Sequence, residues 1–223
     1  MAAGALRASP VPCEAETVER QPGRPADPAK RAAILAAGKA AFLRDGYGVS
    51  MDRIADEAGV SKQTIYKHFA SKEALFLEII QERASTMRAP LRDHPQDEPV
   101  EITLQRLAIA YMHLLLMDEF GRVLRLMAAE ATRCPHVISE FMRVGPQTSI
   151  ATLAAYLVEQ RERGTLAIPD PQLAAEQFFG LVGGGHLHTR AVLGVQPDWT
   201  PEQLGERART SVEVFLAAYR TAR

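Results

Sequence analysis

Residues 50–72 read SMDRIADEAGVSKQTIYKHFASK, and this stretch decides how the rest of the chain is organised. Two short helical patterns, at about 51–58 and 61–69, are joined by a turn at Gly59. Glycine suits a sharp turn because it adopts a left-handed backbone without steric cost. Ala55 is small enough to sit where the two helices touch, as a helix-turn-helix requires. The apolar residues that would lock the angle are Ile54, Val60 and Ile65.

The second helix of this pair carries the side chains suited to DNA. It has no acidic residue between Ser61 and Lys72. Glutamine and threonine bond base edges, whereas hydroxyl and ammonium groups suit phosphate oxygens. Helical hairpins with a merely solvated polar face are also common, so this geometry alone leaves DNA binding and an ordinary hairpin as equal alternatives.

The composition favours an all-helical protein. Apolar residues make up 47% and aromatic residues only 6%, without alternating β-branched runs, which indicates helices rather than sheets. The net charge of −1 excludes a uniformly basic nucleic-acid binder, so a basic surface must be local. Cys13 and Cys134 cannot supply a disulfide framework or a four-cysteine zinc site. We expect a soluble cytoplasmic protein without membrane contact, because neither a secretory signal nor an apolar run of ~18 residues is found.

Capping signals predict about nine helices. Asp27-Pro28 begins the first helix, and Thr200 with Gln203 forms a capping box that begins the last. The proline-rich charged segment 88–98 is expected to separate helices, whereas 137–163 and 171–193 are each expected to form one helix. Residues 1–27 are expected to be a disordered tail.

Residues 28–80 closely resemble the DNA-binding domain of the TetR family of transcriptional regulators. The resemblance rests on IADEAGVS at 54–61, TIYKHF at 64–69 and SKEAL at 71–75. It implies an all-α homodimer with a three-helix DNA-binding domain (28–74) and a larger helical ligand-binding and dimerisation domain (75–223). By position, the implied base-reading residues are Lys62, Gln63 and Thr64. The implied phosphate contacts are Ser61, Tyr66, Lys67, His68 and Lys72.

The C-terminal half is similar to the AefR-like subgroup of this family, which resembles regulators of efflux and quorum-related genes. The similarity lies in RLMAAEA at 125–131, AAEQFF at 174–179, and the pairs Gly145-Pro146, Asp170-Pro171 and Leu193-Gly194. It implies no particular effector.

Three consecutive glycines, 183–185, mark the expected dimer interface. No strand precedes them and no Lys-Ser/Thr pair follows, which argues against a phosphate-binding loop. Small residues inside a helix allow another helix to approach closely, so we expect helices 171–193 and 201–220 to pair across a two-fold axis. Packing of these helices within one chain is the alternative.

The middle helices are expected to enclose an apolar ligand pocket with a few polar groups. For each candidate, an ordinary place in the core is the alternative. The candidates are Tyr111, His113, Met117, Phe120, Leu124, Met127, Glu130, Phe141 and Phe178, together with Met142 and Phe179.

No arrangement of residues predicts catalysis, a metal or a cofactor. His186 and His188 would face different directions on a helix, and Pro135 interrupts the register between Glu130 and His136. Together with this absence, the resemblance to the TetR family implies a non-enzymatic repressor that a small molecule releases from a palindromic operator. The alternative is a DNA-binding regulator that has no small-molecule effector and acts as a DNA- or protein-interaction module.

Overall fold

The computed structural model describes residues 27–184, 186–195 and 197–221. These residues form eleven α-helices and one π-helical segment, and the only β pairing among them is an isolated bridge between Leu166 and Arg220. The predicted all-α fold is therefore confirmed. The tail expected at 1–27 lies, apart from Asp27, outside the described residues.

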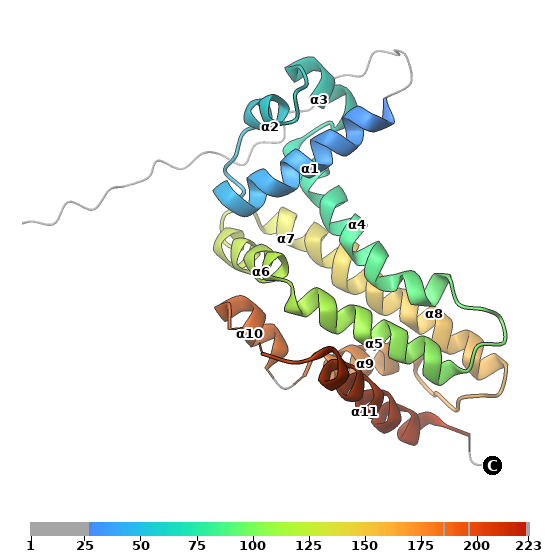
Figure 1. Ribbon diagram of the computed structural model, residues 1–223. Helices are drawn as coiled ribbons and strands as arrows, with labels where there is room; N and C mark the ends of the chain where they lie inside the picture. The colour runs from blue at the N-terminus through green and yellow to red at the C-terminus, as the bar shows by residue number, and fades with distance from the viewer. Residues whose placement is uncertain (1–26, 185, 196, 222–223) are drawn as a thin grey trace, which may run out of the picture.

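The first three helices form one end of the molecule: α1 (Pro28–Asp45), α2 (Met51–Glu57) and α3 (Lys62–His68) (Figure 1). Ser50 and Ser61 cap α2 and α3, because their hydroxyls accept hydrogen bonds from backbone N–H groups of the first turn. Gly59 has a φ of +65°, which places the turn between α2 and α3 in the left-handed region. The predicted helix-turn-helix is present.

Helix α4 (Lys72–Arg92) leads from this end into the body of the molecule (Figure 1). It begins at the Ser71 cap and continues through Pro90, so the break expected from residue 88 starts only after Arg92. Pro90 and Leu91 are buried in the last turn. Their packing outweighs the one backbone hydrogen bond that the proline cannot donate.

The body contains the remaining helices, and two of its segments differ from the prediction. Residues 137–163 pass through a π-helical segment at Gly145-Pro146, and residues 171–193 break after Val182. These interruptions raise the count from about nine to eleven. The elements are α5 (Val100–Leu116), α6 (Asp118–Glu130), α7 (Pro135–Met142), η1 (Arg143–Gln147), α8 (Thr148–Glu162), α9 (Pro171–Val182), α10 (Leu187–Leu193) and α11 (Pro201–Tyr219).

The break after α9 lets α10 turn against α6. Glycines at 183 and 184 favour helix less than other residues, and His186 then takes a φ of +75°. A Cβ on Gly121 would lie 2.1 Å from the Ala191 carbonyl oxygen, so α6 and α10 touch backbone to backbone. Arg125 donates to the carbonyl oxygens of Ala191 (3.2 Å) and Val192 (2.8 Å), which holds the end of α10 in place.

Two apolar cores hold the helices together. One lies among α5, α8, α9 and α11, and the other joins α1–α4 to α6 and α7. Met127, Val137 and Phe141 belong to the second core, although they lie far beyond residue 74. Helices α1–α3 therefore share their core with helices of the body.

Candidate DNA-binding surface and internal cavity

Helix α3 is held by one buried side chain, and the others are exposed or half-buried. Ile65 is fully buried, whereas the predicted base-reading residues Lys62 and Gln63 are exposed and Thr64 is half-buried. Lys62 Nζ lies 3.0 Å from Asp52 Oδ2 of α2. The Thr64 and Ser61 hydroxyls lie 2.8 Å apart. Two of the three predicted base-reading residues thus contact neighbours in the helix-turn-helix itself.

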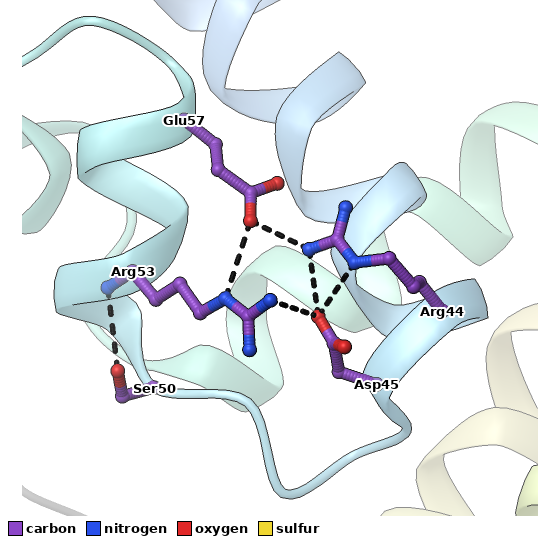
Figure 2. A network of polar contacts seen from close by, with 5 residues as sticks. All are labelled: Arg44, Asp45, Ser50, Arg53 and Glu57. Carbon is purple, nitrogen blue, oxygen red and sulfur yellow. Dashed lines mark hydrogen bonds and ion pairs between the residues drawn. The ribbon is translucent and has the colours of Figure 1, made fainter.

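The angle between α1 and α2 is fixed by a cluster of ion pairs that Figure 2 shows from close by. Arg44, at the end of α1, lies 2.6 Å from Asp45 and 2.5 Å from Glu57 of α2. Arg53 reaches the same two carboxylates at 3.2 and 3.3 Å. The hydrogen bond from Arg44 lowers the pKa of Asp45, so this carboxylate stays ionised. The cluster ties the first helix of the motif to α1.

The predicted phosphate contacts lie on the exposed side of α3 and at the start of α4. Lys67 is exposed, and Tyr66 and Lys72 are half-buried. The Lys72 ammonium lies 4.7 Å from the centre of the Tyr47 ring, which steadies it beside the N-terminus of α4. Ser61 is exposed and also caps α3.

His68 differs from the other predicted phosphate contacts. Its Nδ1 is buried and finds no hydrogen-bond partner among the described residues. Burial, followed by the charge of Arg31, lowers the pKa of the imidazole. Arg31 itself pairs with Glu78 of α4 at 2.8 Å. His68 is therefore neutral at pH 7 in the DNA-free protein.

A cavity of about 400 Å³ lies between α1 and α4 on one side and the body helices on the other. Its wall is mainly apolar, and its volume falls in the ~300–1,000 Å³ range of small-molecule sites. The candidates that line it are Tyr111, Met117, Phe120, Leu124, Phe141, Met142 and Phe179.

Four expected pocket residues do not line this cavity. His113 is exposed, because it lies two residues after Tyr111 and faces another side of α5. Phe178 is fully buried in the body core, one residue away from the lining Phe179. Met127 belongs to the core shared with α1–α4, and Glu130 lies beside Arg133 at 3.7 Å. The apolar periodicity did not distinguish cavity wall from filled core.

A tyrosine–histidine pair, which sequence reasoning missed, forms one polar part of the wall. Tyr111 Oη lies 3.0 Å from His188 Nε2, and His188 Nδ1 lies 3.2 Å from the Gly183 carbonyl oxygen. A carbonyl only accepts, so Nδ1 carries a proton, and in that neutral tautomer Nε2 accepts from the phenol. Burial raises the pKa of Tyr111 to about 12, which keeps the phenol protonated.

An ion cluster, also missed, forms a second polar part of the wall. Glu119 of α6 pairs with Lys39 of α1 at 2.8 Å and with Arg83 of α4 at 2.9 Å. The hydrogen bond from Lys39 lowers the pKa of Glu119. All three side chains line the cavity, and each is about one third exposed. No short sequence pattern connects residues from three separate helices.

The described part of the chain contains neither a metal-binding cluster nor a single helix suited to span a membrane. No group of three or more His, Cys, Asp or Glu side chains lies close enough to hold a metal ion there. No single described helix is long and apolar enough to cross a membrane; α5 and α6 meet that length and composition only as a pair, bent by 66°.

An exposed recognition helix at the end of a helical body defines a helix-turn-helix transcriptional regulator. Residues 34–79 match the bacterial regulatory proteins of the tetR family, and residues 102–221 match the C-terminal domain of the AefR-like transcriptional repressors. The chain belongs to the TetR family of transcriptional regulators, with a C-terminal domain of the AefR-like type.

Individual relatives agree with this assignment. A TetR-family regulator from Mesorhizobium loti is 33% identical, with a TM-score of 0.72 over 86% of this chain and 97% of that one. The flavonoid-responsive regulator FrrA is also 33% identical, with a TM-score of 0.69 over 88% and 100% of the two chains. The regulator EthR of Mycolicibacterium smegmatis is 26% identical over 83% of this chain and 85% of its own. The activator FasR of the same organism is 39% identical, but only 29% of its length is matched.

Proposed function

We propose that the protein is a homodimeric repressor of the cytoplasm that a small, largely apolar molecule releases from a palindromic operator. One observation carries this proposal: α4 begins beside the recognition helix at Lys72 and forms part of the cavity wall from Phe76 to Met87. A ligand that favours one position of α4 would thereby change the position of α3. The ligand can shift this equilibrium only by its difference in affinity for the two positions.

For DNA binding, we propose that some residues of α3 and α4 contact base edges and that others contact phosphates. Lys62, Gln63 and Thr64 would read base edges in the major groove. The two half-sites would lie about one helical turn apart, ~34–36 Å, on one face of the duplex. The proposed phosphate contacts are Ser61, Tyr66, Lys67, His68 and Lys72.

The proposed dimer interface consists of α9 and α11. Each presents apolar side chains to solvent in the single chain: Leu173 and Leu181 from α9, and Val214 from α11, all at least 40% exposed. Val214→Glu should produce monomers in sedimentation equilibrium, because it would bury a charge between the subunits. Ile102→Glu, a similar change at an exposed position of α5, should leave the dimer intact.

The aromatic and aliphatic wall, together with the similarity to a flavonoid-responsive regulator, supports an aromatic effector of flavonoid size. Its hydroxyl or carbonyl groups would bond the Tyr111–His188 pair. Operator sites are first selected from random duplex DNA, and affinity is then measured by fluorescence anisotropy with and without a panel of flavonoids. An effector should weaken binding by about 5–150-fold.

A cavity-filling variant tests whether the effector acts from this cavity. Ile150 lines the cavity and is half-buried, so Ile150→Trp should occupy the space, keep operator affinity and abolish the response. An unchanged response in this variant would place the effector elsewhere. Operator binding that no cavity ligand alters would instead favour a regulator without a small-molecule effector.

A further inference from the structure

The ion cluster of Lys39, Arg83 and Glu119 joins three helices through a single atom. Glu119 Oε2 of α6 lies 2.8 Å from Lys39 Nζ of α1 and 2.9 Å from an Arg83 nitrogen of α4. Both ion pairs tie α6 to the two helices that lead to the DNA-binding surface. The bridge lies on the cavity wall, where a bound molecule would touch it.

The charges on this wall do not cancel. The charged side chains that line the cavity are Lys39, Arg83 and Glu119, so two cations face one carboxylate. His188 also lines it, where it is hydrogen-bonded to Tyr111 and to the Gly183 carbonyl oxygen. One excess positive charge in a mainly apolar wall favours a ligand with an apolar body and one negative group.

We propose that the cavity accepts an amphipathic monoanion whose acidic group replaces Glu119 as the partner of Lys39 and Arg83. This inference rests on the proposed function, in which the cavity holds the effector. Guanidinium and ammonium groups bind carboxylates, sulfonates and phenolates by charge-assisted hydrogen bonds. The chemical class is therefore an aromatic or aliphatic acid rather than a neutral hydrocarbon or a cation.

Replacement of Glu119 would remove a polar link between the two sides of the cavity. Helix α6 is clamped to α10 by the close approach of Gly121 to Ala191 and by the hydrogen bonds of Arg125. It therefore stays with the body when the bridge opens. Helices α1 and α4 lose this polar link to it, and the apolar core that they share with α6 is then what opposes their movement with the DNA-binding surface. Glu119 is thus a positioning residue that connects ligand charge to DNA release.

Two fluorescent probes test the charge requirement. 8-Anilinonaphthalene-1-sulfonate carries one negative charge, and N-phenyl-1-naphthylamine has a similar aromatic body without it. Arg83→Met should weaken binding of the sulfonate by about tenfold and change binding of the neutral probe by less than about twofold. Glu119→Gln should strengthen sulfonate binding several-fold, because the competing carboxylate is gone, and should weaken operator binding in the absence of any probe.

Matched variants separate charge from structural damage. Arg83→Lys keeps the cation and should retain sulfonate affinity. Arg92→Met removes a charge from the same helix at a residue that pairs with Asp93 and does not line the cavity, so it should affect neither probe. Thermal unfolding of each variant verifies that it is folded.

The outcomes distinguish this inference from the proposed function. If Arg83→Met changes both probes equally, or neither, while Ile150→Trp abolishes binding of both, the cavity binds ligands without selecting an anion and the inference is wrong. If Ile150→Trp changes the binding of neither probe, the cavity is not the ligand site, and the proposed function fails with the inference. Selective loss of sulfonate binding in Arg83→Met supports both the charge inference and the proposed function.

Discussion

Lys62 Nζ lies 3.0 Å from Asp52 Oδ2, so the first residue of the recognition helix is already paired with the helix before it. Both side chains are more than half exposed, and such pairs contribute about 0.2–1 kcal/mol. A Lys62 that reads a base must leave Asp52. The pair therefore opposes DNA binding weakly and steadies the side chain before binding.

Asp52→Asn should strengthen operator binding by up to about fivefold, since Lys62 is released and one negative charge is removed from the DNA-binding surface. Fluorescence anisotropy at fixed salt measures the change. Asp56→Asn is the matched control, because it removes the same charge from an exposed position of α2. Equal gains in the two variants would show a general charge effect and no role for the Lys62–Asp52 pair.

Thr64→Ala should relax preference at one base pair by about 1–3 kcal/mol, because the variant loses both the hydroxyl and the methyl group that we propose contact a base. The measurement compares affinities for operators with single base-pair substitutions. Thr86→Ala serves as the control, since that hydroxyl bonds the Glu82 carbonyl oxygen on α4. A Thr64→Ala profile identical to that of the unmodified protein would rule out base reading by this residue.

Lys72→Ala should weaken binding to all DNA sequences equally, because a phosphate contact carries no sequence information. The slope of log affinity against log salt concentration should fall in magnitude by about 1. Titrations at several salt concentrations measure both effects. An unchanged slope would mean that the ammonium stays over the Tyr47 ring and does not reach a phosphate.

His68 should make stability depend on pH. Burial lowers the pKa of its imidazole in the folded protein, whereas the unfolded chain has the ordinary value of about 6.5. The unfolded chain therefore binds the proton first as the pH falls. The free energy of unfolding contributed by this group is fully present above about pH 6.5 and decreases below it. Urea unfolding at pH 7.5 and 5.5 should show a smaller loss in His68→Asn. The exposed His113→Asn should retain the full loss.

Gly121→Ala should destabilise the fold by about 1–3 kcal/mol or more, because the new Cβ would lie 2.1 Å from the Ala191 carbonyl oxygen and must displace α10. Gly205→Ala is the same substitution in an open setting, and we expect the opposite effect. It lies inside α11 with no neighbouring atom within 4 Å of a Cβ, so it should stabilise by about 0.4–1 kcal/mol. Thermal unfolding compares the two. A neutral Gly121→Ala would mean that α10 moves without cost.

Features controlled by neighbouring residues could be predicted from the sequence. Asp27, Ser50, Ser61 and Thr200 all cap helices in the structure, and Gly59 makes the expected left-handed turn. Caps and turns depend on side chains within three or four positions, so a local pattern contains them.

Features controlled by distant residues could not be predicted. Tyr111 and His188 meet across 77 positions, and the partners of Glu119 lie on two other helices. The end of α9 depends on glycines that also allow a continuous helix, and packing of α10 against Gly121 decides between the two. Periodicity identifies an inward side chain, but only the final packing determines whether it faces a filled core or an empty space.

The length of α4 has a mechanical consequence. At about 1.5 Å per residue, Lys72 lies about 30 Å along the axis from Arg92, whereas Met87 in the cavity wall lies only about 7.5 Å from it. If α4 tilts as a rigid lever about its C-terminal end, a displacement of about 0.5 Å at Met87 becomes about 2 Å at Lys72. A shift of that size exceeds the tolerance of a hydrogen bond. In the proposed mechanism, a ligand that moves Met87 by less than a bond length would therefore take the proposed phosphate contact of Lys72 out of reach.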